Sequence, residues 1–352
     1  MSHLVLYRKY RPRLFQEVVG QPHVVTVLQN ALRARRVAHA YLFSGLRGTG
    51  KTTLARLFAK AVNCQLLSKQ LHKEPLAVSA VEPCNHCAVC NDFNEGCAPD
   101  FIEMDAASTR GIDDIRELKD GVYIAPLKAE KKVYLIDEVH MLTKEAFNAL
   151  LKTLEEPPDH ALFLLATTEP EKVPATILSR VTHFVLRRVA PEVIQDRLEA
   201  LAKHEKISLA PEAARVVVLL AEGSLRDAET MLGTLLDAFP EGVGESEARL
   251  VFGLPRAELT RNLRHALLAR DRARAFAIVN DSLVEGADPR IMARMVVEDL
   301  RGAWKAQNFT NIAGLDIMQK LAHAYPSRAE AIAPELPLEV AIIELTEEKD
   351  SD

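Results

Sequence analysis

A glycine-rich run that ends in lysine and threonine is the clearest chemical signal in this sequence. Residues 45–52 read GLRGTGKT, the phosphate-loop pattern, between an apolar strand-like run at 41–44 and a helix-like run. The glycines let backbone N–H groups curl around phosphate oxygens, and the helix N-terminus adds partial positive charge. In this pattern the lysine contacts the β- and γ-phosphates and the hydroxyl ligates Mg²⁺. We therefore predict an ATP site at Gly45, Leu46, Arg47, Gly48, Thr49, Gly50, Lys51, Thr52 and Thr53.

Two consecutive acids follow a second apolar run and complete the predicted site. Residues 133–138 read VYLIDE, which places Asp137 and Glu138 at the carboxyl edge of a sheet, facing the phosphates. Asp137 would hold Mg²⁺ through water, and Glu138 would polarise the attacking water, because phosphoryl transfer mainly needs a positioned nucleophile and neutralised charge. Paired acids after a strand also fit a solvated turn, so this assignment depends on the phosphate loop.

Two arginines outside the loop are candidates for contacting a transferred phosphoryl group. Arg180 follows the fourth predicted strand in the run LSR, and Arg226 begins a predicted helix in the run GSLRD. A guanidinium group suits the charge that develops on the phosphoryl oxygens. By spacing alone, an arginine in either position more often belongs to a surface salt bridge.

All five cysteines lie between residues 64 and 97, and four of them have the spacing of a metal site. Cys84, Cys87 and Cys90 are separated by two-residue gaps, and Cys64 precedes them at the end of the helix after the phosphate loop. Four thiolates suit tetrahedral Zn²⁺. His86 is an alternative ligand, and Cys97 is expected to be an incidental buried thiol. We find no catalytic base beside the cluster, so the zinc would be structural.

The surrounding pattern predicts the elements that position these residues. From Val18 to about Phe184, apolar strand-like runs at 41–44, 101–104, 133–136 and 162–166 alternate with amphipathic helices, which is typical of a parallel α/β domain. Helices are expected at 144–156 (with Thr143 as N-cap), 192–206, 211–222, 224–239, 258–269, 271–285, 289–306, 312–325 and 338–347, with a linker at 240–255. We predict an α/β domain over 1–179 with an insertion at about 64–97, a helical domain over 180–242 and an all-helical domain over 254–350.

The composition is that of a soluble globular protein of several domains. The chain has 352 residues, of which 48% are apolar and 26% charged. It lacks an apolar run of the ~20 residues that span a bilayer, so we expect a cytoplasmic protein without membrane contact. The net charge is −5, yet the first sixty residues carry a single acid, Glu17, among many basic residues. A phosphate-facing surface is compatible with that asymmetry.

Taken together, these motifs resemble the AAA+ clamp-loader subunits gamma/tau of bacterial DNA polymerase III. The likeness is carried by residues 7–12 (YRKYRP), 18–21 (VVGQ), 45–52, 137–140 (DEVH), 154–158 (LEEPP), 166–168 (ATT), 178–180 (LSR) and 223–227 (GSLRD). It implies a P-loop ATPase domain, a helical lid and a helical collar. The family carries a zinc module whose ligands match Cys64, Cys84, Cys87 and Cys90. Residue 181 is Val where the family commonly has Cys.

The resemblance also implies roles for residues that the motifs alone leave open. Thr168, with Thr167 as the alternative, would sense the γ-phosphate, Arg226 would reach it from the lid, and Arg180 would act on the neighbouring subunit. Arg11, Val18 and Val19 would contact the nucleotide. Ser108, Thr109 and Arg110 are candidates for contacting DNA phosphates, although a polar helix cap is the simpler interpretation.

The function implied by the resemblance is ATP-dependent loading of a sliding clamp onto primed DNA during replication. ATP binding would order a ring of subunits and hydrolysis would release the clamp. The expected partners are the delta and delta-prime subunits, further gamma/tau copies, the sliding clamp, primer-template DNA and accessory subunits that meet single-stranded DNA. The chain would be an ATPase within a polymerase complex, without polymerase chemistry of its own. Its rival is an AAA+ remodeller such as a Holliday-junction branch-migration ATPase, which would form closed hexamers and lack the zinc insertion and collar.

Overall fold

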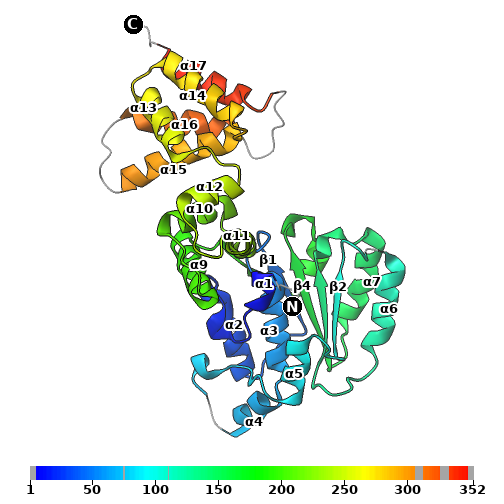
Figure 1. Ribbon diagram of the computed structural model, residues 1–352. Helices are drawn as coiled ribbons and strands as arrows, with labels where there is room; N and C mark the ends of the chain where they lie inside the picture. Colours follow the sequence, from blue (N-terminus) through cyan, green and yellow to red (C-terminus); the bar gives the residue numbers. More distant parts are fainter. Residues whose placement is uncertain (1–4, 74–75, 110, 306–311, 326–332, 348–352) are drawn as a thin grey trace. The chain divides into compact units, whose positions relative to one another are not determined.

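The computed structural model describes residues 5–73, 76–109, 111–305, 312–325 and 333–347 (Figure 1). The chain divides into two compact units. The first comprises Met1–Lys206 with Val217–Asp237, and the second comprises Ile207–Val216 with Ala238–Asp352. The division differs from the three predicted domains, whose boundaries stay a prediction.

The first unit contains a five-stranded parallel sheet in the order β2-β3-β4-β1-β5. Its strands are β1 (Ala40–Ser44), β2 (Phe101–Asp105), β3 (Lys132–Asp137), β4 (Ala161–Thr167) and β5 (Thr182–Val185). The register pairs Ser44 with Thr167 and Asp105 with Asp137. Because all strands are parallel, these polar residues lie together at the carboxyl edge of the sheet.

The four predicted strands are confirmed, and the structure adds a fifth that the sequence pattern did not reveal. β5 pairs with β1 through Tyr41 and Thr182 at the edge of the sheet. It has four residues, THFV, and most of them are exposed. A short edge strand covered on one side only lacks the continuous apolar run that identifies buried parallel strands.

Helices cover both faces of this sheet because alternate side chains of each strand point to opposite faces. In β4, Leu162 and Leu164 pack with α2 (Pro22–Arg33) and α3 (Lys51–Val62). Phe163 and Leu165 pack instead with α6 (Ile112–Val122), α7 (Lys144–Glu155) and α8 (Ala175–Leu178). Figure 1 shows α2 and α3 on one side of the strands and α6 and α7 on the other. The Thr143 hydroxyl accepts from Ala146 N at 3.2 Å and caps α7 as predicted.

The other elements of residues 1–238 are short connectors, the cysteine-rich insertion and three further helices. They are α1 (Leu6–Lys9), η1 (Phe15–Glu17), α4 (Gln65–Lys73), η2 (Val78–Ala80), α5 (Ala88–Glu95), η3 (Val139–Met141), η4 (Pro170–Lys172), α9 (Pro191–Glu205), α10 (Pro211–Ala221) and α11 (Leu225–Ala238). Helices α9 to α11 fall where the sequence predicts them.

The second unit is helical. Its remaining elements are α12 (Glu245–Val251), α13 (Ala257–Leu268), α14 (Arg272–Val284), α15 (Pro289–Lys305), α16 (Ile312–Ala324) and α17 (Leu336–Thr346). Leu263, Val296 and Ile342 belong to the single core that α13 to α17 share. Among the described residues, no helix has both the length and the apolarity to cross a membrane.

One prediction for this unit is wrong, because the expected linker at 240–255 contains the helix α12. The helix has seven residues and begins after Gly244, whose N–H donates to the Glu247 carboxylate at 3.0 Å. The glycines and prolines on either side of α12 dominate the local pattern, so a helix of two turns is hidden between them.

Candidate nucleotide and metal sites

The phosphate loop lies between the end of β1 and the start of α3. Gly50 has a φ of 101° and caps α3, and Gly48 has a φ of 76°. A Cβ atom at Gly48 would approach Ser224 Oγ to 1.9 Å, because the loop passes directly under the start of α11. The backbone N–H groups of Leu225 and Arg226 donate to Gly48 O at 3.1 and 3.3 Å. Positive φ at Gly48 and Gly50 gives the loop its curl, and the absence of a Cβ at Gly48 allows its contact with the start of α11.

Lys51 is held inside this curl. Its ammonium donates to Gly45 O at 3.0 Å and to Leu46 O at 3.1 Å, and the residue is only 6% exposed. Burial lowers the pKa of Lys51, and the carboxylates of Glu138 and Asp137 oppose that shift. Lys51 thus places a nearly buried positive charge within the loop, and this charge would stabilise a bound phosphate anion.

The two predicted Mg²⁺ ligands meet across the end of the sheet. Thr52 Oγ1 donates to Asp137 Oδ2 at 2.7 Å, although 85 residues separate them in the chain. One hydroxyl and one carboxylate on rigid elements form a donor set that suits Mg²⁺, which takes few protein ligands and keeps several waters. These two residues fit the metal, and each would hold it from its own element.

Glu138 is held by hydrogen bonds from the neighbouring strand. It adopts a left-handed backbone with φ 47°. Both the N–H and the hydroxyl of Thr168 donate to Glu138 Oε2, at 3.1 and 3.0 Å. The structure therefore brings the predicted water-polarising acid and the predicted γ-phosphate sensor into direct contact. Thr167, the alternative sensor, is instead fully buried.

His140 is a site residue that sequence reasoning missed. Its side chain is 6% exposed and lies between two carboxylates, with Nδ1 3.4 Å from Glu138 Oε2 and Nε2 3.3 Å from Glu169 Oε1. Nδ1 is also 3.0 Å from Thr167 Oγ1. The signal was present in the DEVH string, but the importance of the histidine depends on Thr167 at the end of β4 and on Glu169 just after it, which only the fold brings close.

The two candidate arginines lie in different places. Arg226 faces the cavity beside the loop, where its guanidinium stacks 4.6 Å above the Tyr7 ring and donates to the Tyr7 hydroxyl at 3.4 Å. That hydrogen bond lowers the pKa of Tyr7. Arg180 lies elsewhere, beside α7, with Nη2 2.7 Å from Glu155 Oε1 and Nη1 2.7 Å from Thr176 O.

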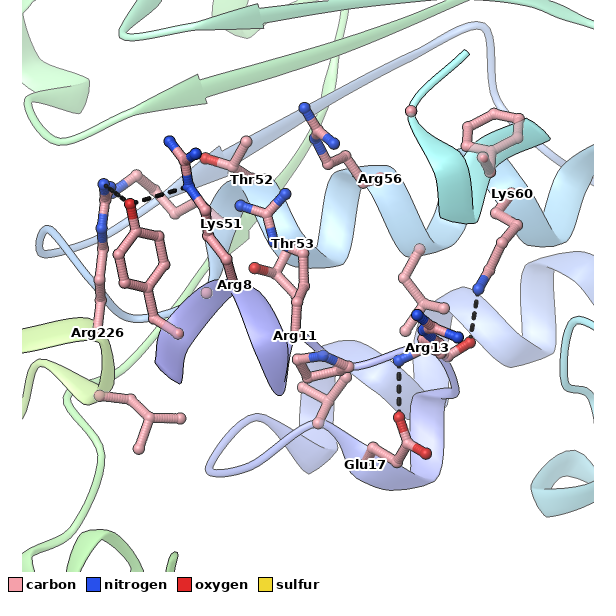
Figure 2. Close-up of a pocket in the computed structure, with 18 of the residues that line it drawn as sticks. Arg8, Arg11, Arg13, Glu17, Lys51, Thr52, Thr53, Arg56, Lys60 and Arg226 are labelled. Carbon is pink, nitrogen blue, oxygen red and sulfur yellow. Dashed lines mark hydrogen bonds between the residues drawn. The ribbon is translucent and has the colours of Figure 1, made fainter. Parts of the chain in front are cut away.

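A cavity of about 900 Å³ opens beside the loop, large enough for a nucleotide. Figure 2 shows Lys51, Thr52 and Thr53 facing Arg8 and Arg11 across it. Burial and the neighbouring Arg56 both lower the pKa of Arg11, which indicates crowded positive charge. The predicted residues on the lining are Arg11, Val18, Val19, Gly48, Thr49, Gly50, Lys51, Thr52, Thr53, Asp137 and Arg226. The chemistry of this lining suits a polyanion.

The four predicted metal ligands also meet. The sulfur atoms of Cys64, Cys84, Cys87 and Cys90 all lie within 4.8 Å of one another. Tetrahedral Zn²⁺ with Zn–S bonds of about 2.3 Å requires sulfur atoms about 3.8 Å apart, so the cluster has the right size. The N–H groups of Leu67 and Cys84 donate to Cys64 Sγ at 3.4 and 3.3 Å, which favours a thiolate. The four thiols therefore fit zinc.

Two alternatives at this cluster are resolved by position. His86 is exposed and its Nδ1 lies 2.5 Å from Cys84 O, so its ring faces the backbone and lies outside the sulfur group. Cys97 was expected to be a buried thiol, and that expectation is wrong, because Cys97 is exposed. It follows Gly96, which ends α5 in a left-handed conformation.

The candidate DNA-contacting residues lie just after β2. The hydroxyls of Ser108 and Thr109 donate to Asp105 O at 3.0 and 2.7 Å; Ser108 is exposed and Thr109 is half-buried. Arg110 lies outside the described residues. In this arrangement the two hydroxyls stabilise their own turn.

Comparison of the sequence and the structure with those of known proteins identifies the family to which this chain belongs. Residues 20–190 match the family model described as DNA polymerase III, delta subunit, and this range includes the intact phosphate loop. The tau subunit of Bacillus subtilis DNA polymerase III is 42% identical over 82% of this chain and 49% of its own length. The tau subunit of Escherichia coli is 43% identical over 82% of this chain and 43% of its own length. The chain thus spans about half the length of these tau relatives.

The gamma subunit of Buchnera aphidicola from Schizaphis graminum is 39% identical over 80% of this chain and 74% of its own length. Among solved structures, the Thermotoga maritima RuvB Holliday junction branch migration motor superposes with a TM-score of 0.51. It shares 18% identity over 73% of this chain and 79% of its own, which indicates a common AAA+ fold only. On the gamma and tau relatives, this chain belongs to the DNA polymerase III gamma/tau family.

Proposed function

We propose that this chain is an ATP-hydrolysing motor subunit that loads a sliding clamp onto primed DNA during replication. The observation that carries the proposal is the contact of Thr52 with Asp137 at 2.7 Å beside the buried Lys51, in a basic cavity of a gamma/tau family member. The loop N–H groups and Lys51 would hold the phosphates, and Thr52 with Asp137 would hold Mg²⁺, which supplies charge neutralisation at the phosphoryl oxygens.

Hydrolysis would then depend on Glu138 and on two arginines. Glu138 would orient and polarise the attacking water. Thr168, which contacts Glu138, would sense the γ-phosphate. Arg226 would contact the phosphates from α11 of the same chain. Arg180 lies away from the cavity of its own chain and pairs with Glu155, which supports a role at a neighbouring subunit.

The proposed assembly is based on the role proposed for Arg180 at a neighbouring subunit and on membership of the gamma/tau family. The partners would be delta and delta-prime subunits, further copies of this chain, the sliding clamp, primer-template DNA and accessory subunits, all in the cytoplasm. Residues 1–179 would form the ATPase domain, 180–242 the lid and 254–350 the collar. Ser108, Thr109 and Arg110 are proposed to meet DNA phosphates. The four cysteines would hold a structural zinc ion.

The test is the ATPase rate of the purified chain, alone and with delta, delta-prime, clamp and primed DNA. We expect strong stimulation by the full set and a loss on the order of 10³-fold in Arg180→Ala. Arg215→Ala is the matched control, because Arg215 is also ion-paired, with Glu212, but 66% of its side chain is exposed. A high ATPase rate of the chain alone, measured in hexamers and unchanged by the clamp, would instead favour the remodeller function.

A further inference from the structure

The wall of the cavity opposite the phosphate loop has little regular structure of its own. This wall is the segment 11–19, of which residues 11–13 and 17–19 line the cavity. Its sole element within the described residues is the three-residue η1. Inside the wall, Glu17 accepts from Arg13 N at 2.7 Å and from Leu14 N at 3.3 Å. Other parts of the protein must therefore hold the wall in place.

Lys60 provides the first anchor. It lies on α3, the helix that begins with Lys51, and is 4% exposed. Its ammonium donates to Arg13 O at 2.8 Å, a contact that Figure 2 shows beside Glu17. It also donates to Asn85 Oδ1 at 2.6 Å and to Asn94 Oδ1 at 3.0 Å. A buried ammonium needs such oxygen partners, so all three acceptors are fixed around it.

Both asparagines belong to the cysteine module, defined here as residues 81–95. Asn85 lies between the metal-ligand candidates Cys84 and Cys87 in a left-handed conformation with φ 59°, and Asn94 follows Cys90 on α5. Asn94 Nδ2 donates to Asn85 Oδ1 at 3.3 Å, and Asn85 Nδ2 donates to Arg13 O at 3.2 Å. The positions of the Asn85 and Asn94 side-chain amides thus depend on the arrangement of the neighbouring cysteines.

Glu82 provides a second anchor that does not involve Lys60. Its carboxylate accepts from Phe15 N at 2.6 Å and from Gln16 N at 2.9 Å. Gln29 on α2 donates to Val81 O at 3.1 Å, which ties the start of the module to α2. The cysteine module therefore contacts the wall at Arg13, Phe15 and Gln16.

We propose that the cysteine module is a structural part of the nucleotide site, and that Lys60 is the positioning residue that joins them. The cluster of thiols, held by zinc, fixes Asn85, Asn94 and Glu82. These groups, with Lys60, hold the wall at the distance from α3 that a nucleotide requires. Loss of the metal would therefore weaken nucleotide binding without any contact between the two ligands. The inference deepens the proposed function, because it assumes that the cavity binds ATP.

The first experiment replaces Lys60 by Met, which keeps the stem and removes the three donors. Lys69→Met is the matched control, because Lys69 belongs to the neighbouring α4 and is exposed. We expect the Kd for a fluorescent ATP analogue to rise about tenfold in Lys60→Met and to stay unchanged in Lys69→Met. The zinc content, measured with a colorimetric dye after thiol modification, should stay at the wild-type value. An unchanged Kd in Lys60→Met would overturn the proposal.

A second arm measures the wall itself and needs no nucleotide. Amide hydrogen exchange of the segment 13–17 should accelerate in Glu82→Gln, and also in the wild type treated with a zinc-selective chelator in the presence of Mg²⁺. Unchanged exchange under both conditions would contradict the anchoring, and it would do so even if Lys60→Met failed to fold. A wild-type chain that binds no ATP would instead reject the proposed function, while the exchange measurement would still decide the anchoring.

Discussion

Thr168 donates two hydrogen bonds to one oxygen of Glu138, from its hydroxyl at 3.0 Å and from its backbone N–H at 3.1 Å. The contact joins the residue after β4 to the residue after β3, which are adjacent strands. It fixes the direction of the carboxylate that we propose to polarise water. A change at residue 168 should therefore alter hydrolysis without altering the phosphate loop.

We predict that Thr168→Val lowers the ATPase rate on the order of tenfold, because the hydroxyl bond is lost while the backbone bond remains. The measurement is steady-state hydrolysis together with the Kd for nucleotide, which should stay close to wild type. Thr234→Val, on α11 and exposed, serves as the control. An equal fall in both variants would remove the special role of Thr168.

His140 should contribute to stability as well as to the site. Its ring lies between Glu138 and Glu169 and contacts the hydroxyl of the fully buried Thr167, so His140→Ala removes one polar partner of that buried hydroxyl. We expect a loss of about 1–3 kcal/mol in the free energy of unfolding, measured by urea denaturation. His323→Ala is the control, because His323 is exposed and its ring nitrogen contacts Gln319 O on its own helix. A smaller loss in His140→Ala than in the control would contradict the assignment.

Nucleotide affinity should fall with rising pH through Lys51. Burial lowers the pKa of this lysine below its ordinary value of 10.5, so the free chain loses the ammonium earlier than an exposed lysine would. Above that pKa, binding of a polyanion must first take up a proton, and the Kd therefore rises with pH. Lys51→Arg keeps its charge and should show a flat profile between pH 7 and about 10. Parallel profiles for the two proteins would exclude Lys51 as the titrating group.

The thiols should divide into four that hold metal and one that does not. For the wild type we expect about one zinc ion per chain; Cys90→Ser removes a fully buried ligand candidate, so its zinc content should fall well below that value, with a lower Tm. Cys97→Ser should keep both values, because Cys97 is exposed and lies outside the cluster. Zinc content and Tm are measured on the same preparations. Full zinc in Cys90→Ser would contradict the four-thiol site.

Much of the fold could be predicted because its signals are contiguous in the sequence. The loop at 45–52, the strand-like runs before it and before Asp137, and the cap at Thr143 each depend on neighbouring residues, and the structure contains all of them. The edge strand Thr182–Val185 and the helix Glu245–Val251 were missed, because both are short and their apolar patterns are weak. The roles of the site residues stay predictions until they are measured.

The sequence by itself determined which residues are candidates for phosphate and metal chemistry, because backbone curvature, helix polarity and thiol spacing are local properties. Only the tertiary structure decided which of these residues meet. It placed His140 between Glu138 and Glu169, kept Arg180 against Glu155, and connected the cysteine module to the cavity wall through Lys60. Such contacts depend on strand order and on packing between segments far apart in the chain, which no local pattern encodes.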